Sequence, residues 1–151
     1  MPQSLSAVYL HLVFSTKNRE PSLKALLIRE AMHAYLAGVS KKLDCASLIV
    51  GGTEDHVHLL CRFTRTLTLA DWVKELKRAS SLWIKTQEIS LSDFSWQGGY
   101  GLFSVSKSHI GKTRDYIAGQ EKHHQIQTFQ DEFRAFLTKH QIEWDERYVW
   151  D

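Results

Sequence analysis

The sequence contains little cysteine and no long hydrophobic run. Its two cysteines, Cys45 and Cys61, lie in separate apolar segments without companions, so we expect small buried side chains rather than a zinc site. No apolar run approaches the roughly 18 to 20 residues that span a bilayer, which argues against a membrane protein. The start of the chain also lacks the basic and apolar stretches of a secretory signal. We therefore expect a cytoplasmic protein with reduced thiols.

A strong excess of one charge is absent as well. The 19 Lys and Arg residues are nearly balanced by 17 Asp and Glu residues, which gives a net charge of +2. Proteins that coat nucleic acid indiscriminately are far more basic, so any nucleic-acid-binding surface must be local. With 151 residues and 43% hydrophobic content, the chain is long and apolar enough for one domain with a proper core, over residues 1–151.

The spacing of apolar residues predicts an alternation of strands and helices. In chain order the predicted elements are strand 7–15, helix 22–43, strands 46–52 and 56–63, a helix from residue 69, strand 100–106, helix 108–124 and a terminal helix from residue 129. This order predicts an α+β, ferredoxin-like split βαβ fold, with an antiparallel sheet and helices on one face. The additional C-terminal helices, one of which carries Tyr116, could cover the other face.

Three of the predicted helices begin next to a hydroxyl residue. Thr68 and Thr128 each stand three residues before an aspartate, which is the pattern of a capping box. Ser108 is in position to cap the helix over 108–124.

Two histidines lie one residue apart on the predicted strand 56–63. Because side chains alternate along a strand, His56 and His58 point to the same face. The opposite face is apolar and suited to a core, with Val57, Leu59, Cys61 and Phe63. A neutral imidazole is a common ligand of divalent metals, so this pair is a candidate metal site.

Tyr116 and Gln120 lie four residues apart on the predicted helix 108–124, with His124 one turn further. This spacing places them on one helix face. The amide oxygen of Gln120 suits Mg²⁺ or Mn²⁺ better than zinc. Tyr116 is a candidate nucleophile, but its ordinary pKa near 10 means that it needs a nearby cation or base.

Each of these residues also has a simpler interpretation. His56 and His58 could be hydrogen-bonded or exposed histidines, and Tyr116 could be an ordinary surface tyrosine. His123 and His124 could form a solvated helix end, although His124 could reach the site. Their combination on one small α+β domain favours a functional site.

A basic stripe follows one face of the predicted helix from residue 69. We expect Lys74, Arg78 and Lys85, with Lys77 nearby, to contact DNA phosphates together with Lys17 and Arg19. The alternative is that the stripe is only the solvated side of the helix.

Four segments together resemble the small single-tyrosine transposases of bacterial insertion sequences, of the insertion sequence 200/605 type, which belong to the HUH endonuclease superfamily. They are HLVFSTK at 11–17, EDHVHLL at 54–60, WQGGY at 96–100 and YIAGQEKHH at 116–124. The resemblance covers nearly the whole chain.

The resemblance implies a metal-dependent transposase that acts on single-stranded DNA. His56 and His58 would bind Mg²⁺ or Mn²⁺, and Gln120 would complete the site. Tyr116 would attack the DNA to leave a 5′-phosphotyrosine and a free 3′-hydroxyl. The enzyme would recognise hairpins at element ends and work as a homodimer, in which the tyrosine helix of one subunit can serve the histidines of the other.

Two other functions remain open at this point. The chain could be a domesticated or non-catalytic protein that binds hairpins of single-stranded DNA without strand transfer. It could also be a generic ferredoxin-like nucleic-acid-binding module, in which His56 and His58 contact phosphates or stack on bases.

Overall fold

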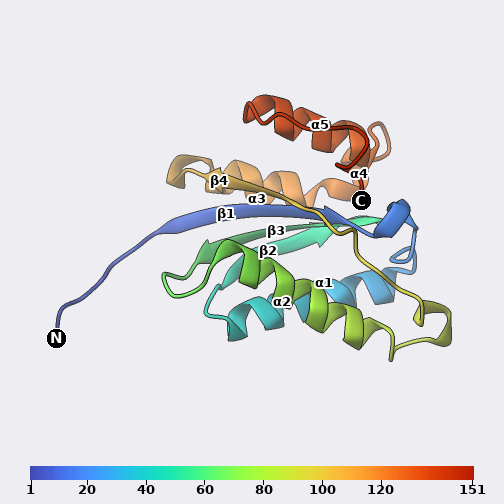
Figure 1. Ribbon diagram of the computed structural model, residues 1–151, viewed down its shortest axis with the longest axis horizontal. Coiled ribbons are helices and arrows are strands. Elements are labelled where there is room, and N and C mark those ends of the chain that lie inside the picture. Colours follow the sequence, from blue (N-terminus) through green and yellow to red (C-terminus); the bar gives the residue numbers. More distant parts are fainter.

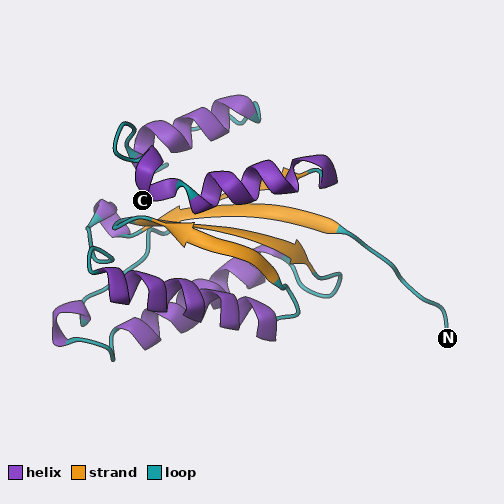
Figure 2. Cartoon of the chain, turned by 180° about the vertical axis from the view of Figure 1, so that it is seen from behind, coloured by secondary structure: helices purple, strands orange, loops and turns teal.

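The computed structural model describes residues 1–151 and contains a four-stranded antiparallel sheet with helices on both faces (Figures 1 and 2). The strands are β1 (Val8–Ser15), β2 (Ser47–Gly52), β3 (His56–Phe63) and β4 (Gly101–Val105), in the spatial order β2-β3-β1-β4. The α-helices are α1 (Leu26–Lys42), α2 (Leu69–Ile84), α3 (Ile110–Ala118), α4 (Gln120–His123) and α5 (Phe129–Lys139). This arrangement confirms the predicted α+β, ferredoxin-like fold.

Helices α1 and α2 cover one face of the sheet, and α3, α4 and α5 lie on the other (Figure 1). The larger hydrophobic core fills the α1 and α2 side and contains the apolar face predicted for β3, from Val57 to Phe63. Alternation along β1 sends Leu12 into this core and turns His11 to the opposite side. The sheet thus presents a hydrophobic face to α1 and α2 and a histidine-bearing face to α3 and α5.

A smaller core fixes α5 on the histidine-bearing face. It consists of five buried residues from β1, β4 and α5, namely Val13, Phe103, Phe129, Phe133 and Leu137. Thr128 begins α5 as predicted, because its hydroxyl accepts a hydrogen bond of 3.1 Å from the backbone N–H of Asp131. Thr68 caps α2 in the same way.

The predicted continuous helix over 108–124 is wrong at its start and in its middle. Ser108 lies in a short 3-10 helix, Lys107–His109, and its hydroxyl bonds to His109 Nδ1 at 3.1 Å instead of capping α3. Gly119, with φ −92° and ψ 13°, separates α3 from α4. Because glycine has a low helix propensity, interrupting the helix at Gly119 costs little free energy.

Close packing of α3 on β2 sets the height of the tyrosine helix above the sheet. Gly51 of β2 lies under Ile117 of α3, and a Cβ atom at Gly51 would be only 2.8 Å from both Cγ2 and the carbonyl oxygen of Ile117. The missing side chain therefore permits the approach of the backbone that carries Tyr116. None of the helices combines the length and the apolar character needed to cross a membrane.

Candidate active site

His56 is buried at the start of β3 and is held by partners on both ring nitrogens. Its Nδ1 lies 2.7 Å from Asp55 Oδ1 and 3.0 Å from Thr53 Oγ1. Burial tends to raise the pKa of Asp55, but the hydrogen bond with His56 lowers it, so Asp55 is a carboxylate that accepts the Nδ1 proton. In the tautomer with the ring proton on Nδ1, His56 Nε2 has its lone pair turned into the site.

Gln120 faces that lone pair with an oxygen. Its Nε2 donates a hydrogen bond of 3.0 Å to Glu132 Oε2, which leaves Oε1 at 3.0 Å from His56 Nε2. In this tautomer, His56 Nε2 and Gln120 Oε1 are two acceptor atoms that face each other in the buried interior. A shared cation would satisfy both atoms.

His58 lies on the same face and is fully buried. Its Nδ1 is 2.8 Å from His11 Nε2, and its Nε2 is 3.0 Å from Glu132 Oε1. Burial lowers the pKa of His58 to about 4, although Glu132 opposes the shift. His58 is therefore a neutral imidazole at pH 7, which is the form that binds metals.

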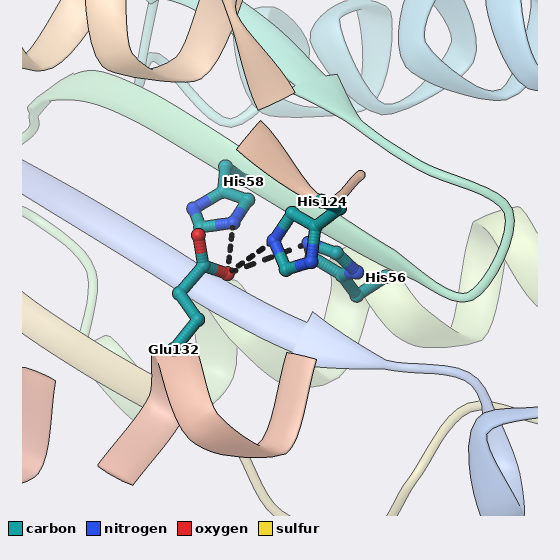
Figure 3. Close-up of side chains that lie close together, drawn as sticks. All are labelled: His56, His58, His124 and Glu132. Carbon is teal, nitrogen blue, oxygen red and sulfur yellow. Dashed lines mark hydrogen bonds and ion pairs between the residues drawn. The ribbon is translucent and has the colours of Figure 1, made fainter. Parts of the chain in front are cut away.

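Glu132 of α5 is the central acidic group of the site, with 2% of its surface exposed. Figure 3 shows its carboxylate among His56, His58 and His124. Burial alone would raise the pKa of Glu132. The surrounding imidazoles, of which His124 and His58 have the largest effect, hold this pKa well below its ordinary value. Glu132 thus places a negative charge at the point where the three histidines converge.

The donor set fits a divalent metal. His56, His58, His124 and Glu132 each offer one ligand atom, and these atoms all lie within 4.8 Å of one another. His124 Nε2 is 3.1 Å from Glu132 Oε1, yet it is buried without a hydrogen bond of acceptable geometry. Since buried polar atoms are rarely left without a partner, this nitrogen has the character of a metal ligand.

Tyr116 adjoins the same carboxylate. Its hydroxyl donates a hydrogen bond to Glu132 Oε2, and its ring centre lies 5.9 Å from that of His58. Burial and the negative charge of Glu132 raise the pKa of Tyr116 above its ordinary value near 10. In this arrangement the phenol keeps its proton, and one chain supplies both the tyrosine and the histidines.

The basic residues predicted to contact DNA are not brought to this site. Lys74 and Arg78 are exposed on α2, and Lys85 is exposed directly after its last residue, on the other side of the sheet from Tyr116. Arg78 forms an ion pair with Glu75 on the same helix.

The three other residues predicted to contact DNA are Lys77 on α2 and Lys17 and Arg19 after β1. Lys77 donates hydrogen bonds of 2.8 Å and 2.6 Å to the carbonyl oxygens of Gln97 and Gly99, and burial lowers its pKa to about 8. Arg19 donates to the carbonyl of Trp150 at 3.0 Å. Lys17, just beyond β1, is exposed.

Two site residues were not identified from the sequence, Glu132 and His11. Glu132 could have been found from the sequence, because it is an acidic residue within the apolar stripe between Phe129 and Phe136 of the terminal helix. His11 lies at an inward-facing position of β1, and nothing in its local sequence distinguishes it from a core residue.

The chain is similar to known proteins in sequence and in fold. The sequence model of the family described as transposase IS200 like matches residues 4–120. No curated protein matches the chain.

Two solved structures share the fold. One is a protein assigned as a transposase from Deinococcus radiodurans R1, with a TM-score of 0.61 and 21% identity over 80% of this chain and 95% of that one. The other is a REP-associated tyrosine transposase bound to a REP hairpin, with a TM-score of 0.60 and 12% identity over 82% of this chain and 72% of that one.

Proposed function

The chain belongs to the IS200-like transposase family, and on that premise we propose that it is a metal-dependent enzyme that cleaves and rejoins single-stranded DNA through Tyr116. The observation that carries the proposal is the contact of the Tyr116 hydroxyl with Glu132, whose carboxylate also contacts His58 and lies beside His56 and His124. A nucleophile and a candidate metal site therefore meet at one buried carboxylate.

His56 and His58 would hold the metal, with Gln120, His124 and Glu132 in position to complete its coordination. Imidazole nitrogens suit Mn²⁺ better than Mg²⁺, which prefers oxygen ligands and retains several waters. When bound, the ion would act as a Lewis acid that stabilises negative charge on the phosphate oxygens.

Outer partners would keep the two histidines oriented. Asp55 accepts the Nδ1 proton of His56, and His11 bonds Nδ1 of His58, so both Nε2 atoms are directed to the centre of the cluster.

Tyr116 would attack a phosphodiester of the strand. A bond forms between the phenolic oxygen and phosphorus while the bond from phosphorus to the 3′-oxygen breaks, which leaves a 5′-phosphotyrosine and a 3′-hydroxyl. Glu132 Oε2 is in position to receive the phenolic proton, and the departing 3′-oxygen takes up a proton. The phosphotyrosine preserves the energy of the diester, so a 3′-hydroxyl can later reverse the attack and join strands.

The DNA substrate of the proposal is a single strand with a hairpin near the element end. It is supported by the family membership and by the fold shared with a transposase bound to a REP hairpin. Lys74 and Arg78 on α2 and Lys85 at its end form an exposed basic stripe, and with Lys17 and Arg19 they remain candidates for phosphate contacts. A homodimer is also part of the proposal.

The experiment is incubation of labelled single-stranded DNA from the flanks of the encoding locus with Mn²⁺ or with EDTA, followed by denaturing electrophoresis. We expect a covalent protein–DNA band with Mn²⁺ that is absent with EDTA and absent in Tyr116→Phe. Hairpin retention in a native gel without any covalent band would overturn the catalytic proposal in favour of a non-catalytic hairpin-binding protein.

A further inference from the structure

Two cavities of opposite charge flank the candidate active site. The first, of about 640 Å³, is lined by His124 and by four acidic residues, Glu54, Asp55, Glu121 and Asp131, with Arg29 as its one Lys or Arg residue. The second, of about 710 Å³, lies between β4, α3 and α5 and is lined by Lys112 and Lys139, with Glu132 as its one carboxylate. We refer to the first as the acidic cavity and to the second as the basic cavity.

The basic cavity leads to the nucleophile. Tyr116 and Glu132 both line it, so the phenol is reached from this side, whereas neither residue lines the acidic cavity. A phosphodiester carries negative charge, and the four carboxylates of the acidic cavity would repel it. The approach of a DNA strand to Tyr116 is therefore favoured through the basic cavity.

The two lysines of this cavity are free for a ligand. Lys112 on α3 and Lys139 on α5 are exposed, and neither forms an ion pair or a side-chain hydrogen bond within the chain. They come from the two helices that form the walls of the cavity, so a strand that passes between these helices would meet a cation on each side.

Aromatic side chains form another part of the lining. Phe103 stacks on Phe136, with ring centres 5.3 Å apart and planes 18° from parallel, and on His140 at 4.6 Å and 27°. Phe136 and His140 are only half-buried, so part of their surface is open to the cavity. Flat aromatic surfaces beside cations are the features that bind single-stranded nucleic acid without strong sequence preference.

We propose that the basic cavity binds a nucleotide of the DNA strand next to the bond that Tyr116 attacks. Lys112 and Lys139 contact its phosphates, and Phe136 and His140 receive its base. The inference rests on the proposed function and adds where the strand lies. Because α5 follows the part of the chain that the family match covers, residues 4–120, this wall of the cavity is not described by the family match.

The test measures binding of a short fluorescent oligothymidylate to the full-length protein in EDTA, by anisotropy over a series of salt concentrations. We expect Lys112→Ala combined with Lys139→Ala to weaken binding several-fold. The slope of log affinity against log salt should fall by about 0.7 for each lysine removed. Lys41→Ala combined with Lys42→Ala, on the distant end of α1, should leave both quantities unchanged.

A second pair of variants tests the cavity without removing a lysine. Ala135 and Thr138 are both exposed on α5, but only Ala135 lines the cavity. Ala135→Glu should weaken binding strongly by placing a carboxylate among the phosphates, while Thr138→Glu should bind as the unaltered protein does. Equal binding by all variants, or equal weakening by the control variants, would overturn the inference.

The outcome is separable from that of the proposed function. A covalent band that depends on Tyr116, together with binding that ignores the lysines and Ala135→Glu, would reject the cavity and keep the catalytic proposal. Binding that depends on the cavity residues, without any covalent band, would support the cavity and reject catalysis.

Discussion

Tyr116 on α3 donates a hydrogen bond to Glu132 on α5, and this contact joins the family-matched part of the chain to the helix that follows it. The second oxygen of the same carboxylate lies 3.0 Å from His58 Nε2. Glu132 therefore links the nucleophile to the histidine cluster. The candidate site is complete only when α5 is folded onto the sheet.

Loss of the Glu132 charge should weaken metal binding. A metal that binds only the folded protein raises its melting temperature in proportion to RT ln(1 + [metal]/Kd). For Glu132→Gln we expect an affinity for Mn²⁺ at least about tenfold lower, which reduces the stabilisation by about 1.4 kcal/mol at saturating metal. Thermal melts over an Mn²⁺ series measure this. His109→Ala, which removes an exposed imidazole outside the cluster, is the control, and an equal Mn²⁺ response in all three proteins would contradict a role of Glu132 as ligand.

The approach of α3 to β2 should depend on the missing side chain of Gly51. Gly51→Ala would place a methyl group 2.8 Å from the Ile117 carbonyl, so α3 must shift, at a cost of about 1–3 kcal/mol. We expect a lower free energy of unfolding in urea and slower formation of the covalent band, because Tyr116 moves with Ile117. Gly38→Ala is the matched control. No atom lies within 4 Å of a Cβ there, and the change should stabilise α1 by up to about 1 kcal/mol. Identical unfolding of the two variants would count against the proposed packing constraint.

The fold was predictable because its signals are local. Alternation in β3 and the hydroxyl caps of Thr68 and Thr128 depend on residues within a few positions of one another, and these features are present in the structure. The return bond of a capping box, from the aspartate to the threonine N–H, is not formed. The interruption of the tyrosine helix at Gly119 was missed because Tyr116 and Gln120 fit one continuous helix by spacing alone.

The site was only partly predictable because part of it depends on long-range contacts. Glu132 becomes a site residue only when α5 folds back over His58, a contact between residues 74 positions apart. Lys77 likewise lies beside the basic stripe of α2 in the sequence. In the structure, its ammonium group donates to the carbonyl oxygens of Gln97 and Gly99 in a distant loop. No local spacing encodes either partner.

His33 should make the protein less stable in mild acid. Its Nε2 is buried without a hydrogen bond, and burial, with the charge of Arg29, lowers its pKa from 6.5 to about 4. As the pH falls below 6.5, the unfolded chain takes up this proton before the folded chain does. The free energy of unfolding should therefore decrease between about pH 6.5 and pH 4, by on the order of 3 kcal/mol from this group.

Urea unfolding in EDTA, at pH 7 and at about pH 4.5, measures the effect. Between these pH values, the free energy of unfolding should decrease less in His33→Leu than in the unaltered protein. His109→Gln, at an exposed histidine, should follow the unaltered protein. If the free energy of unfolding of His33→Leu fell in acid by the same amount as that of the unaltered protein, the His33 imidazole would not be the cause of the decrease.

The exposed cations of α2 provide a separate test of hairpin binding. If Lys74 and Arg78 contact phosphates, their replacement by alanine should lower hairpin affinity and reduce its dependence on salt. Arg78 is already paired with Glu75, so we expect Lys74→Ala to account for the larger part of the change. Gel retention of a hairpin oligonucleotide at several salt concentrations measures this. Unchanged affinity and salt dependence would assign the stripe to the solvated side of the helix.

The assembly of the active site within one chain predicts the result of mixing two inactive variants. Tyr116→Phe keeps the histidines but lacks the nucleophile, and His58→Ala keeps the nucleophile but lacks a ligand. In this structure Tyr116 reaches Glu132 and His58 of its own chain, so a mixture contains no protomer with a complete site. We expect no covalent band from the mixture with Mn²⁺ and labelled single-stranded DNA. If the tyrosine helix instead served the histidines of a second subunit, a mixed dimer would hold one complete site and the band would return. Size-exclusion chromatography with light scattering, run on the same mixture, shows whether dimers form, so an absent band from dimers supports assembly within one chain.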